Sequence, residues 1–198
     1  MKKLTLCLLT ILLSLPVMSQ GIATGYRAFG DVGLVNYFGS GTMNGSSFEI
    51  TTTHGYQVSP HFFIGGGIGF IFSGDLTYGD ISGYPYIKRD ARVDMPLFFD
   101  ANIQILKSAV SPIIDFKAGA CINDDFNPYV ALAAGCRFPL GGNMGLSVKA
   151  AVVVRKVSCE RLDIVSGNKY NNYRITYLYE PIDPDEIDGL YFGVSLDF

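Results

Sequence analysis

Histidine is the side chain best suited to acid, base or triad chemistry near neutral pH. The 198-residue chain has two, His54 and His61. The alternation of residues in TTTHGYQ places His54 on the apolar face of a predicted strand, and His61 belongs to the short turn SPH. Neither adjoins a serine in the arrangement that membrane hydrolases use. We therefore predict no catalytic residues, although a triad assembled from distant segments stays open as an alternative.

Sequence patterns for metals and cofactors are incomplete. GGGIGF at residues 65–70 has the glycine spacing of a phosphate loop, but neither a helical pattern nor a Lys-Ser or Lys-Thr pair follows it, so close strand packing explains it better. The acidic run EPIDPDEIDG could gather Ca²⁺ weakly, but its spacing is not that of an EF-hand, and we expect a solvated loop. Cys121, Cys136 and Cys159 have no metal-like spacing. We predict neither a metal nor a cofactor.

The stretch YIKRDARVD carries three cations, Lys88, Arg89 and Arg92. Guanidinium groups bind phosphate well, so these residues are candidates for contact with anionic lipid headgroups. The alternative is that Asp90 and Asp94, which lie beside them, simply pair with them.

Composition narrows the class of protein. The net charge of −3 argues against a nucleic-acid partner. Charged residues make up 17% of the chain, against about a quarter in typical soluble domains. Mean hydropathy is +0.27. Beyond residue 20, however, no continuous apolar run reaches the roughly 20 residues of a transmembrane helix. Numerous but dispersed apolar residues indicate alternating β-strands.

The first residues predict export. Lys2 and Lys3 precede an apolar run over residues 4–15, and small residues follow at Val17 and Ser19. This is the pattern of a secretory signal peptide. We predict cleavage before Gln20, which divides the chain into a signal peptide, residues 1–19, and one β-barrel domain, residues 20–198.

Eight segments of the mature chain alternate between apolar and polar or small residues, bounded by Gly, Pro, Asn and Ser clusters. They lie near residues 26–37, 48–58, 62–72, 92–105, 114–122, 129–138, 144–155 and 189–198. A helical period fits none of them as well. The sequence therefore predicts an all-β fold, an eight-stranded antiparallel barrel.

Charged residues fall on the opposite face of these strands from the apolar residues. The cations are Arg27, Lys117, Arg137, Lys149 and Arg155, and the carboxylates are Asp31, Glu49, Asp94, Asp100, Asp115 and Asp197. The two signs nearly balance, and side chains just fill an eight-stranded barrel. Because unpaired buried charges are expensive, we predict an internal salt-bridge network that plugs the lumen.

The direction of the apolar face separates a membrane barrel from a soluble lipocalin-like barrel. A water-facing surface needs more Lys and Glu than a chain with 17% charged residues supplies. The apolar stretches also match transmembrane strands of about 9–11 residues. We therefore predict an outward apolar face in a membrane. Because the chain has no Trp, Tyr26, Tyr37, Phe72 and Tyr129 are the predicted interfacial aromatics.

The connections alternate in length, as in bacterial outer-membrane barrels, which have short periplasmic turns and longer external loops. The predicted periplasmic turns are residues 59–61, 106–109 and 139–143, and the predicted external loops are residues 39–47, 73–92 and 158–188. The external connection at residues 123–126 is the exception, since it is short.

The chain resembles a known family at three places: GYQVSPHFFIGGGIGF, MPLFFDANIQI and the C-terminal YFGVSLDF. These resemble the small OmpA/OmpX-type outer-membrane barrels, in particular the PorT-like barrels of Bacteroidetes-type bacteria. The resemblance implies an outer-membrane location, with membrane lipids and the barrel-assembly machinery as partners. It also implies that the alternating tail, Phe192, Val194, Leu196 and Phe198, is an assembly signal.

We expect a non-enzymatic protein with a structural or surface-recognition role. The segment KYNNYRITYLYEP is rich in residue types common at binding hot spots, and SGN at residues 166–168 is a predicted hairpin turn beside it. The candidate contacts with an extracellular protein or glycan are Tyr170, Tyr173, Arg174, Tyr177 and Tyr179. A hairpin stabilised by its own cross-strand Tyr pairs is the alternative. An outer-membrane lipid-modifying enzyme and a soluble periplasmic lipocalin-like ligand-binding barrel are the alternative functions.

Deleting Phe198, or replacing it with Asp, tests the assembly signal. We expect less folded, heat-modifiable barrel in the membrane fraction while export to the periplasm continues, because the terminal outward aromatic is lost. Semi-native gel electrophoresis of membrane and periplasmic fractions measures both. Membrane levels equal to those of the parent would contradict the prediction.

Overall fold

The computed structural model describes residues 24–38, 44–79, 87–106, 110–142, 144–169 and 172–198, with only the backbone described for 163–169, 172–177 and 185. The predicted signal peptide lies outside these residues. The described residues form strands and no helix. The strands are β1 (Gly25–Tyr37), β2 (Gly45–Ser59), β3 (Phe62–Ser73), β4 (Leu76–Tyr78), β5 (Ile87–Arg89), β6 (Arg92–Asp94), β7 (Pro96–Gln104), β8 (Ser111–Cys121), β9 (Asn127–Gly141), β10 (Met144–Lys169) and β11 (Asn172–Asp197). None of the described residues belongs to a helix that could cross a membrane.

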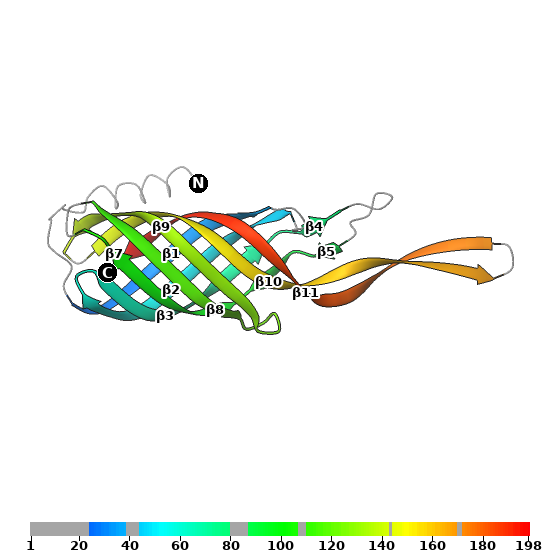
Figure 1. Ribbon diagram of the computed structural model, residues 1–198, viewed down its shortest axis with the longest axis horizontal. Coiled ribbons are helices and arrows are strands. Elements are labelled where there is room, and N and C mark those ends of the chain that lie inside the picture. Colours follow the sequence, from blue (N-terminus) through cyan, green and yellow to red (C-terminus); the bar gives the residue numbers. More distant parts are fainter. Residues whose placement is uncertain (1–23, 39–43, 80–86, 107–109, 143, 170–171) are drawn as a thin grey trace, which may run out of the picture.

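The strands close into an eight-stranded antiparallel barrel, which confirms the predicted fold (Figure 1). The order around the wall is β1, β2, β3, β7, β8, β9, β10 and β11, and β11 pairs back with β1. The short strand β6 extends β7 along β3. The predicted strand over residues 92–105 is thus interrupted, because Pro96 has no amide hydrogen to donate at the junction.

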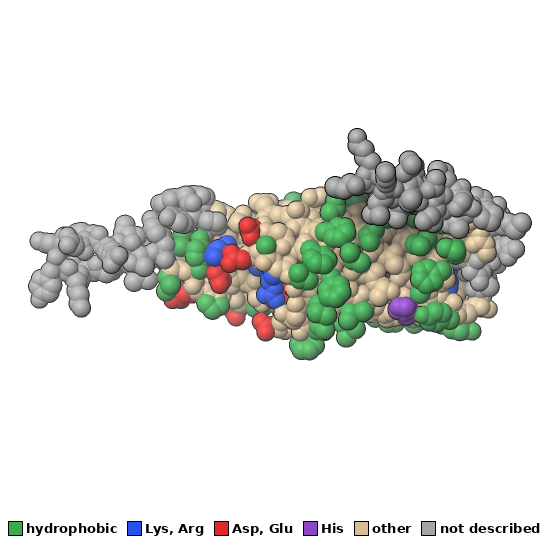
Figure 2. All heavy atoms as spheres, turned by 180° about the vertical axis from the view of Figure 1, so that it is seen from behind, with side chains coloured by type: hydrophobic (Ala, Val, Ile, Leu, Met, Phe, Trp, Pro, Cys, Tyr) green, Lys and Arg blue, Asp and Glu red, His purple; other side chains and the backbone are tan. Residues whose placement is uncertain are grey.

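Side chains alternate between the interior and the outer surface. On β2, Glu49, Thr51 and Thr53 are buried, whereas the intervening Phe48 and Ile50 are 40% and 42% exposed. The outward Val, Leu, Ile, Phe and Tyr side chains of the eight strands form what we call the apolar belt. Those more than half exposed include Leu34, Tyr56, Leu97, Leu132, Val152 and Phe192. Figure 2 shows apolar side chains over one face of the barrel, and charged side chains gathered toward one end.

The two ends of the barrel differ. One carries the turn at residues 59–61 and the connections from β7 to β8 and from β9 to β10, and we call it the turn end. At the other, the arm end, β10 and β11 continue past the wall (Figure 1). At this end, the last pair between β9 and β10 is Tyr129 with Arg155. The last pair between β1 and β11 is Tyr37 with Gly189.

Beyond this point β10 and β11 pair only with each other along most of their length, as far as Lys169 and Asn172. We call residues 159–169 and 172–182 the arm, which extends about 35 Å at the usual rise per residue. The predicted turn at residues 166–168 is wrong, because these residues lie within β10, where Ser166 pairs with Ile175. A local turn motif did not outweigh the pairing of two long strands rich in β-branched and aromatic residues.

A β-bulge marks the base of the arm. Val157 pairs with Asp185 and Cys159 pairs with Ile182, so two steps along β10 match three steps along β11. Pro184 lies within the longer segment, where the ladder is interrupted and no amide donor is required.

The predicted loop at residues 73–92 contains a small hairpin, β4 and β5, that docks on the arm. Lys88 of β5 pairs with Glu160 of β10, and Thr77 of β4 forms a bridge with Asn44 before β2. The docked hairpin buries apolar side chains between the barrel and the base of the arm. This apolar cap consists of Ile71, Leu76, Ile87, Val157 and Ile187, each at most 8% exposed. It covers the arm end of the lumen.

Candidate functional site: the charged lumen

The interior contains an unusual number of charges for so narrow a barrel. The described residues include six buried cationic and seven buried carboxylate side chains. All nine residues of the predicted network are among them, as are Asp94 and Asp197: Arg27, Asp31, Glu49, Asp100, Asp115, Lys117, Arg137, Lys149 and Arg155 are each at most 8% exposed. Ion pairs group all of these residues except Glu49 and Asp100 into three clusters along the barrel.

The seam cluster lies near the turn end, where β1 and β11 close the barrel. Asp197 accepts two hydrogen bonds from Arg137, from Nε to Oδ1 at 2.9 Å and from Nη2 to Oδ2 at 2.7 Å. Asp197 also pairs with Arg27, and Arg27 Nη1 donates to Gln57 Oε1 at 2.9 Å. The Asp197 carboxylate of β11 therefore joins β1 and β9, and Arg27 extends the cluster to β2.

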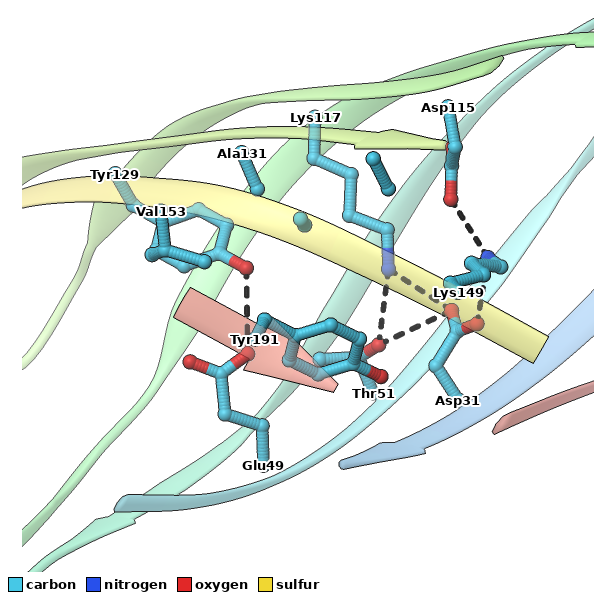
Figure 3. A pocket seen from close by; sticks show the side chains of 12 residues that line it. Asp31, Glu49, Thr51, Asp115, Lys117, Tyr129, Ala131, Lys149, Val153 and Tyr191 are labelled. Carbon is cyan, nitrogen blue, oxygen red and sulfur yellow. Dashed lines mark hydrogen bonds and ion pairs between the residues drawn. The ribbon is translucent and has the colours of Figure 1, made fainter. Parts of the chain in front are cut away.

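The central cluster joins strands from opposite sides of the barrel (Figure 3). Asp31 of β1 pairs with Lys117 of β8 and with Lys149 of β10, each at 2.8 Å. Lys149 also reaches Asp115 Oδ2 at 2.6 Å. Lys117 donates in addition to Thr51 Oγ1 at 3.3 Å. These pairs span the lumen and fix the distance between non-adjacent strands.

The mouth cluster lies toward the arm end, around Asp94. Arg155 and Arg89 each donate to Asp94, at 2.8 Å and 2.7 Å. Arg89 also contacts Asp124 at 3.2 Å, and Arg92 contacts Asp94 at 3.1 Å. Sequence reasoning missed the inward positions of Arg89 and Asp124. A strand of three residues and a turn offer no alternation from which to read a face.

Aromatic rings separate the clusters. Inward positions on β1 run from Arg27 through Phe29 to Asp31. The rings of Phe29 and Phe63 meet edge to face at 4.7 Å, and Arg27 lies over Phe29 at 5.2 Å. Lys149 of the central cluster lies over the same ring at 6.0 Å. Cation–π contacts of this kind link each ring layer to the charges beside it.

A second aromatic layer separates the central and mouth clusters. Phe98 lies 6.2 Å from Tyr129 and beneath Lys117 at 4.9 Å, while Tyr37 lies beneath Arg155 at 5.1 Å. Tyr37 and Tyr129 are 4% and 2% exposed, so their prediction as interfacial aromatics is wrong. Their strand parity places them inside, where their hydroxyls bond to Ser47 and Glu49.

Little free space remains between the layers. A cavity of about 20 Å³ is bordered by Glu49, Tyr129, Tyr191 and the central cluster (Figure 3). This volume holds about one water molecule. Glu49 contacts Tyr129 Oη at 3.4 Å, and its Oε1 atom has no hydrogen-bond partner in the protein. Asp100 contacts Asp115 rather than a cation. Most, but not all, of the buried carboxylates are therefore neutralised by ion pairs.

The two histidines lie apart from the lumen clusters. His54 is on the outer surface, where Tyr26 Oη lies 2.6 Å from Nδ1 and Thr52 Oγ1 lies 3.1 Å from Nε2. His61 contacts the Gln104 carbonyl from its turn at 2.8 Å. Within the described ranges, no group of three or more His, Cys, Asp or Glu residues is placed to hold a metal ion.

The candidate headgroup residues are engaged with carboxylates. Arg89 is 4% exposed and turned into the mouth cluster, which corrects its predicted contact with lipid. Lys88 pairs with Asp90 at 3.3 Å and with Glu160 at 3.5 Å. Partial desolvation lowers the pKa of Lys88, but these two carboxylates outweigh it and hold the pKa above its ordinary value. Arg92 is partly exposed beside the mouth cluster.

The candidate recognition residues that the structure describes lie along the arm. Tyr170 is outside the described residues, and Tyr173, Arg174 and Tyr177 are described only as backbone positions of β11. Tyr179 is half-buried, and Lys88 Nζ lies over its ring at 4.3 Å. The ring thus helps to dock the β4–β5 hairpin on the arm.

The proposed assembly-signal residues share the outer face of β11. Phe192, Val194 and Phe198 are 56%, 41% and 56% exposed, and Leu196 is partly exposed. The backbone of Phe198 exchanges two hydrogen bonds with Ala28, at 2.9 and 3.1 Å, so the chain ends within the barrel wall.

Comparison with protein-family models and with curated proteins finds no match to this chain.

Replacing Lys149 with Ala tests the central cluster. The substitution removes one cationic partner from Asp31 and from Asp115 in the lumen. Removing one partner of a buried ion pair lowers the free energy of unfolding by about 3–5 kcal/mol. We expect a lower urea midpoint by heat-modifiable gel migration, and small-ion leakage in planar bilayers where the parent gives no long-lived conductance steps. Lys156→Ala, at an exposed position of the same strand, is the control. A Lys149→Ala barrel as stable and as tight as the parent would contradict the role of the cluster.

Proposed function

We propose that this chain is a non-enzymatic outer-membrane β-barrel protein that serves a structural or surface-recognition role through the arm. The observation that carries the proposal is the pairing of an outward apolar belt with a charged, filled interior. An apolar exterior is suited to a bilayer, and closure satisfies the backbone without water. The partners are membrane lipids and the assembly machinery that inserts the barrel.

The filled lumen favours this role over ligand binding. A soluble lipocalin-like barrel has an apolar interior that holds its ligand. Here Asp31, Lys117 and Lys149 occupy the corresponding space, and the cavity beside them is about 20 Å³. The hydrogen bonds of His54 and His61 to Tyr26, Thr52 and a backbone carbonyl also support a role other than catalysis.

Extraction of the cell envelope tests the membrane location. We expect the full chain to stay with the membranes in alkaline carbonate and to dissolve only with detergent, because the apolar belt needs lipid or its substitute. Immunoblots of the soluble and pelleted fractions measure the distribution. Release of the protein into aqueous buffer would favour the soluble alternative and would contradict the proposal.

Shortening the arm tests recognition separately. Leu162 and Tyr179 are register partners, so residues 163–178 can be replaced by a two-residue Asn-Gly turn without changing the barrel. We expect a folded, heat-modifiable barrel at normal membrane level whose cells lose binding to host matrix or to neighbouring cells. Unchanged binding in a correctly folded variant would leave only the structural role.

A further inference from the structure

The turn between β8 and β9 is clamped to the neighbouring part of the wall. Asn123 Oδ1 accepts a hydrogen bond from the Met95 amide at 2.7 Å, and Asn123 Nδ2 donates to the Val93 carbonyl at 2.7 Å. The Asn123 carbonyl accepts from Arg92 Nη2 at 2.7 Å. Residues 122–126 are therefore a fixed platform at the arm end.

The platform ends in a left-handed backbone conformation, which Asp adopts more often than most residues but a bulky aromatic residue does not favour. Asp125 and Phe126 have φ values of 51° and 55°. This left-handed region is an outlier for a bulky side chain, whereas glycine enters it readily. The strain does not bury the ring: Phe126 is 71% exposed, the largest fraction among the exposed large hydrophobic side chains of the described residues. Backbone strain that holds an aromatic ring in an exposed position indicates that the ring contacts something outside the chain.

The position of Phe126 on the barrel indicates which environment suits its side chain. Outward positions of β9 run from Leu132 through Val130 to Pro128, and Phe126 lies in the turn just before this strand, one residue from its first position. On the adjacent β10, the apolar row ends at Val154 and gives way to the exposed Lys156. The exposed ring of Phe126 thus lies at the arm-end edge of the apolar belt, close to where charged side chains begin. Aromatic side chains are enriched at this boundary between hydrocarbon and headgroups.

We propose that Phe126 is a lipid anchor that inserts into the headgroup–acyl boundary of the outer leaflet and fixes the immersion depth of the β8–β9 side of the barrel. This inference rests on the membrane location proposed above. The long arm lies on the β10–β11 side, so the short β8–β9 turn is where the wall meets the membrane surface without a tall extension. An anchored ring there resists tilting toward the arm.

The chain has no Trp, so single-Trp variants report their own surroundings. We would place the full mature chain in protein-free vesicles of phosphatidylcholine, with and without brominated acyl chains. The test variant is Phe126→Trp. Leu132→Trp, at an outward position of β9, is the lipid control, and Tyr78→Trp, at the end of β4, is the water control. Heat-modifiable migration verifies folding of each variant.

For Phe126→Trp we expect blue-shifted emission relative to Tyr78→Trp, quenching by the brominated lipid and shielding from aqueous iodide. Water-like emission and iodide quenching equal to those of Tyr78→Trp would overturn the anchor and leave the ring free for a protein partner. If Leu132→Trp is quenched by brominated lipid and Phe126→Trp is not, only the anchor fails. If neither is quenched, the membrane location fails as well.

A second variant keeps the inference testable if the Trp substitution perturbs the turn. Phe126→Asp should lower the urea midpoint in vesicles, because it removes the anchor and places a charge at the boundary. Leu178→Asp replaces an exposed apolar residue of the arm, 48% exposed, and should leave the midpoint unchanged. Equal midpoints for both variants and the parent would overturn the anchor.

Discussion

The need to neutralise buried charge governs this barrel. A narrow lumen has little water to solvate ions, and a buried ion without a partner costs several kcal/mol. Asp31 contacts two lysines from β8 and β10, and Asp197 contacts two arginines from β1 and β9. Each carboxylate therefore ties together strands that are not neighbours along the chain. Backbone ladders alone fix only adjacent strands, so the ion pairs add the long-range constraint on register.

The same constraint explains how the interior is divided. Charges that face one another must be screened from the next cluster, and the rings of Phe29 and Phe98 lie between them while making cation–π contacts on their faces. The apolar cap is the last of these layers, at the arm end, where Val157 and Ile187 are fully buried. The ion pairs, rings and apolar cap thus fill the interior, whereas the apolar belt and the arm lie outside it.

Alternation made most of the wall predictable. A strand has a side-chain period of two, so the face of Lys149 follows from that of Val148 without knowledge of any other strand. The barrel followed from eight such segments, the last of which ends at Phe198. The partners of each charge did not follow, since pairs such as Lys149 with Asp31 depend on register across the lumen.

Elsewhere the local signal was absent or misleading. Arg89 lies in a three-residue strand, and Tyr129 was assigned to the interface by residue type although its parity places it inside. The SGN motif at residues 166–168 predicted a turn, yet the ladder continues through it. In each case residue type or a local motif was a weaker guide than strand pairing and the ion pairs that it permits. The family resemblance and the outer-membrane location stay predictions, because no comparison tests them.

The bulge at the base of the arm has an evolutionary consequence. Between the pairs Val157–Asp185 and Cys159–Ile182, two residues of β11 lie opposite one residue of β10, so the side-chain phase of the arm is offset from that of the wall. Insertions and deletions of single residues beyond this point leave the register of the wall, and so the inward direction of the lumen charges, unchanged. The arm can therefore differ in length and sequence between related chains while the wall keeps its pairing.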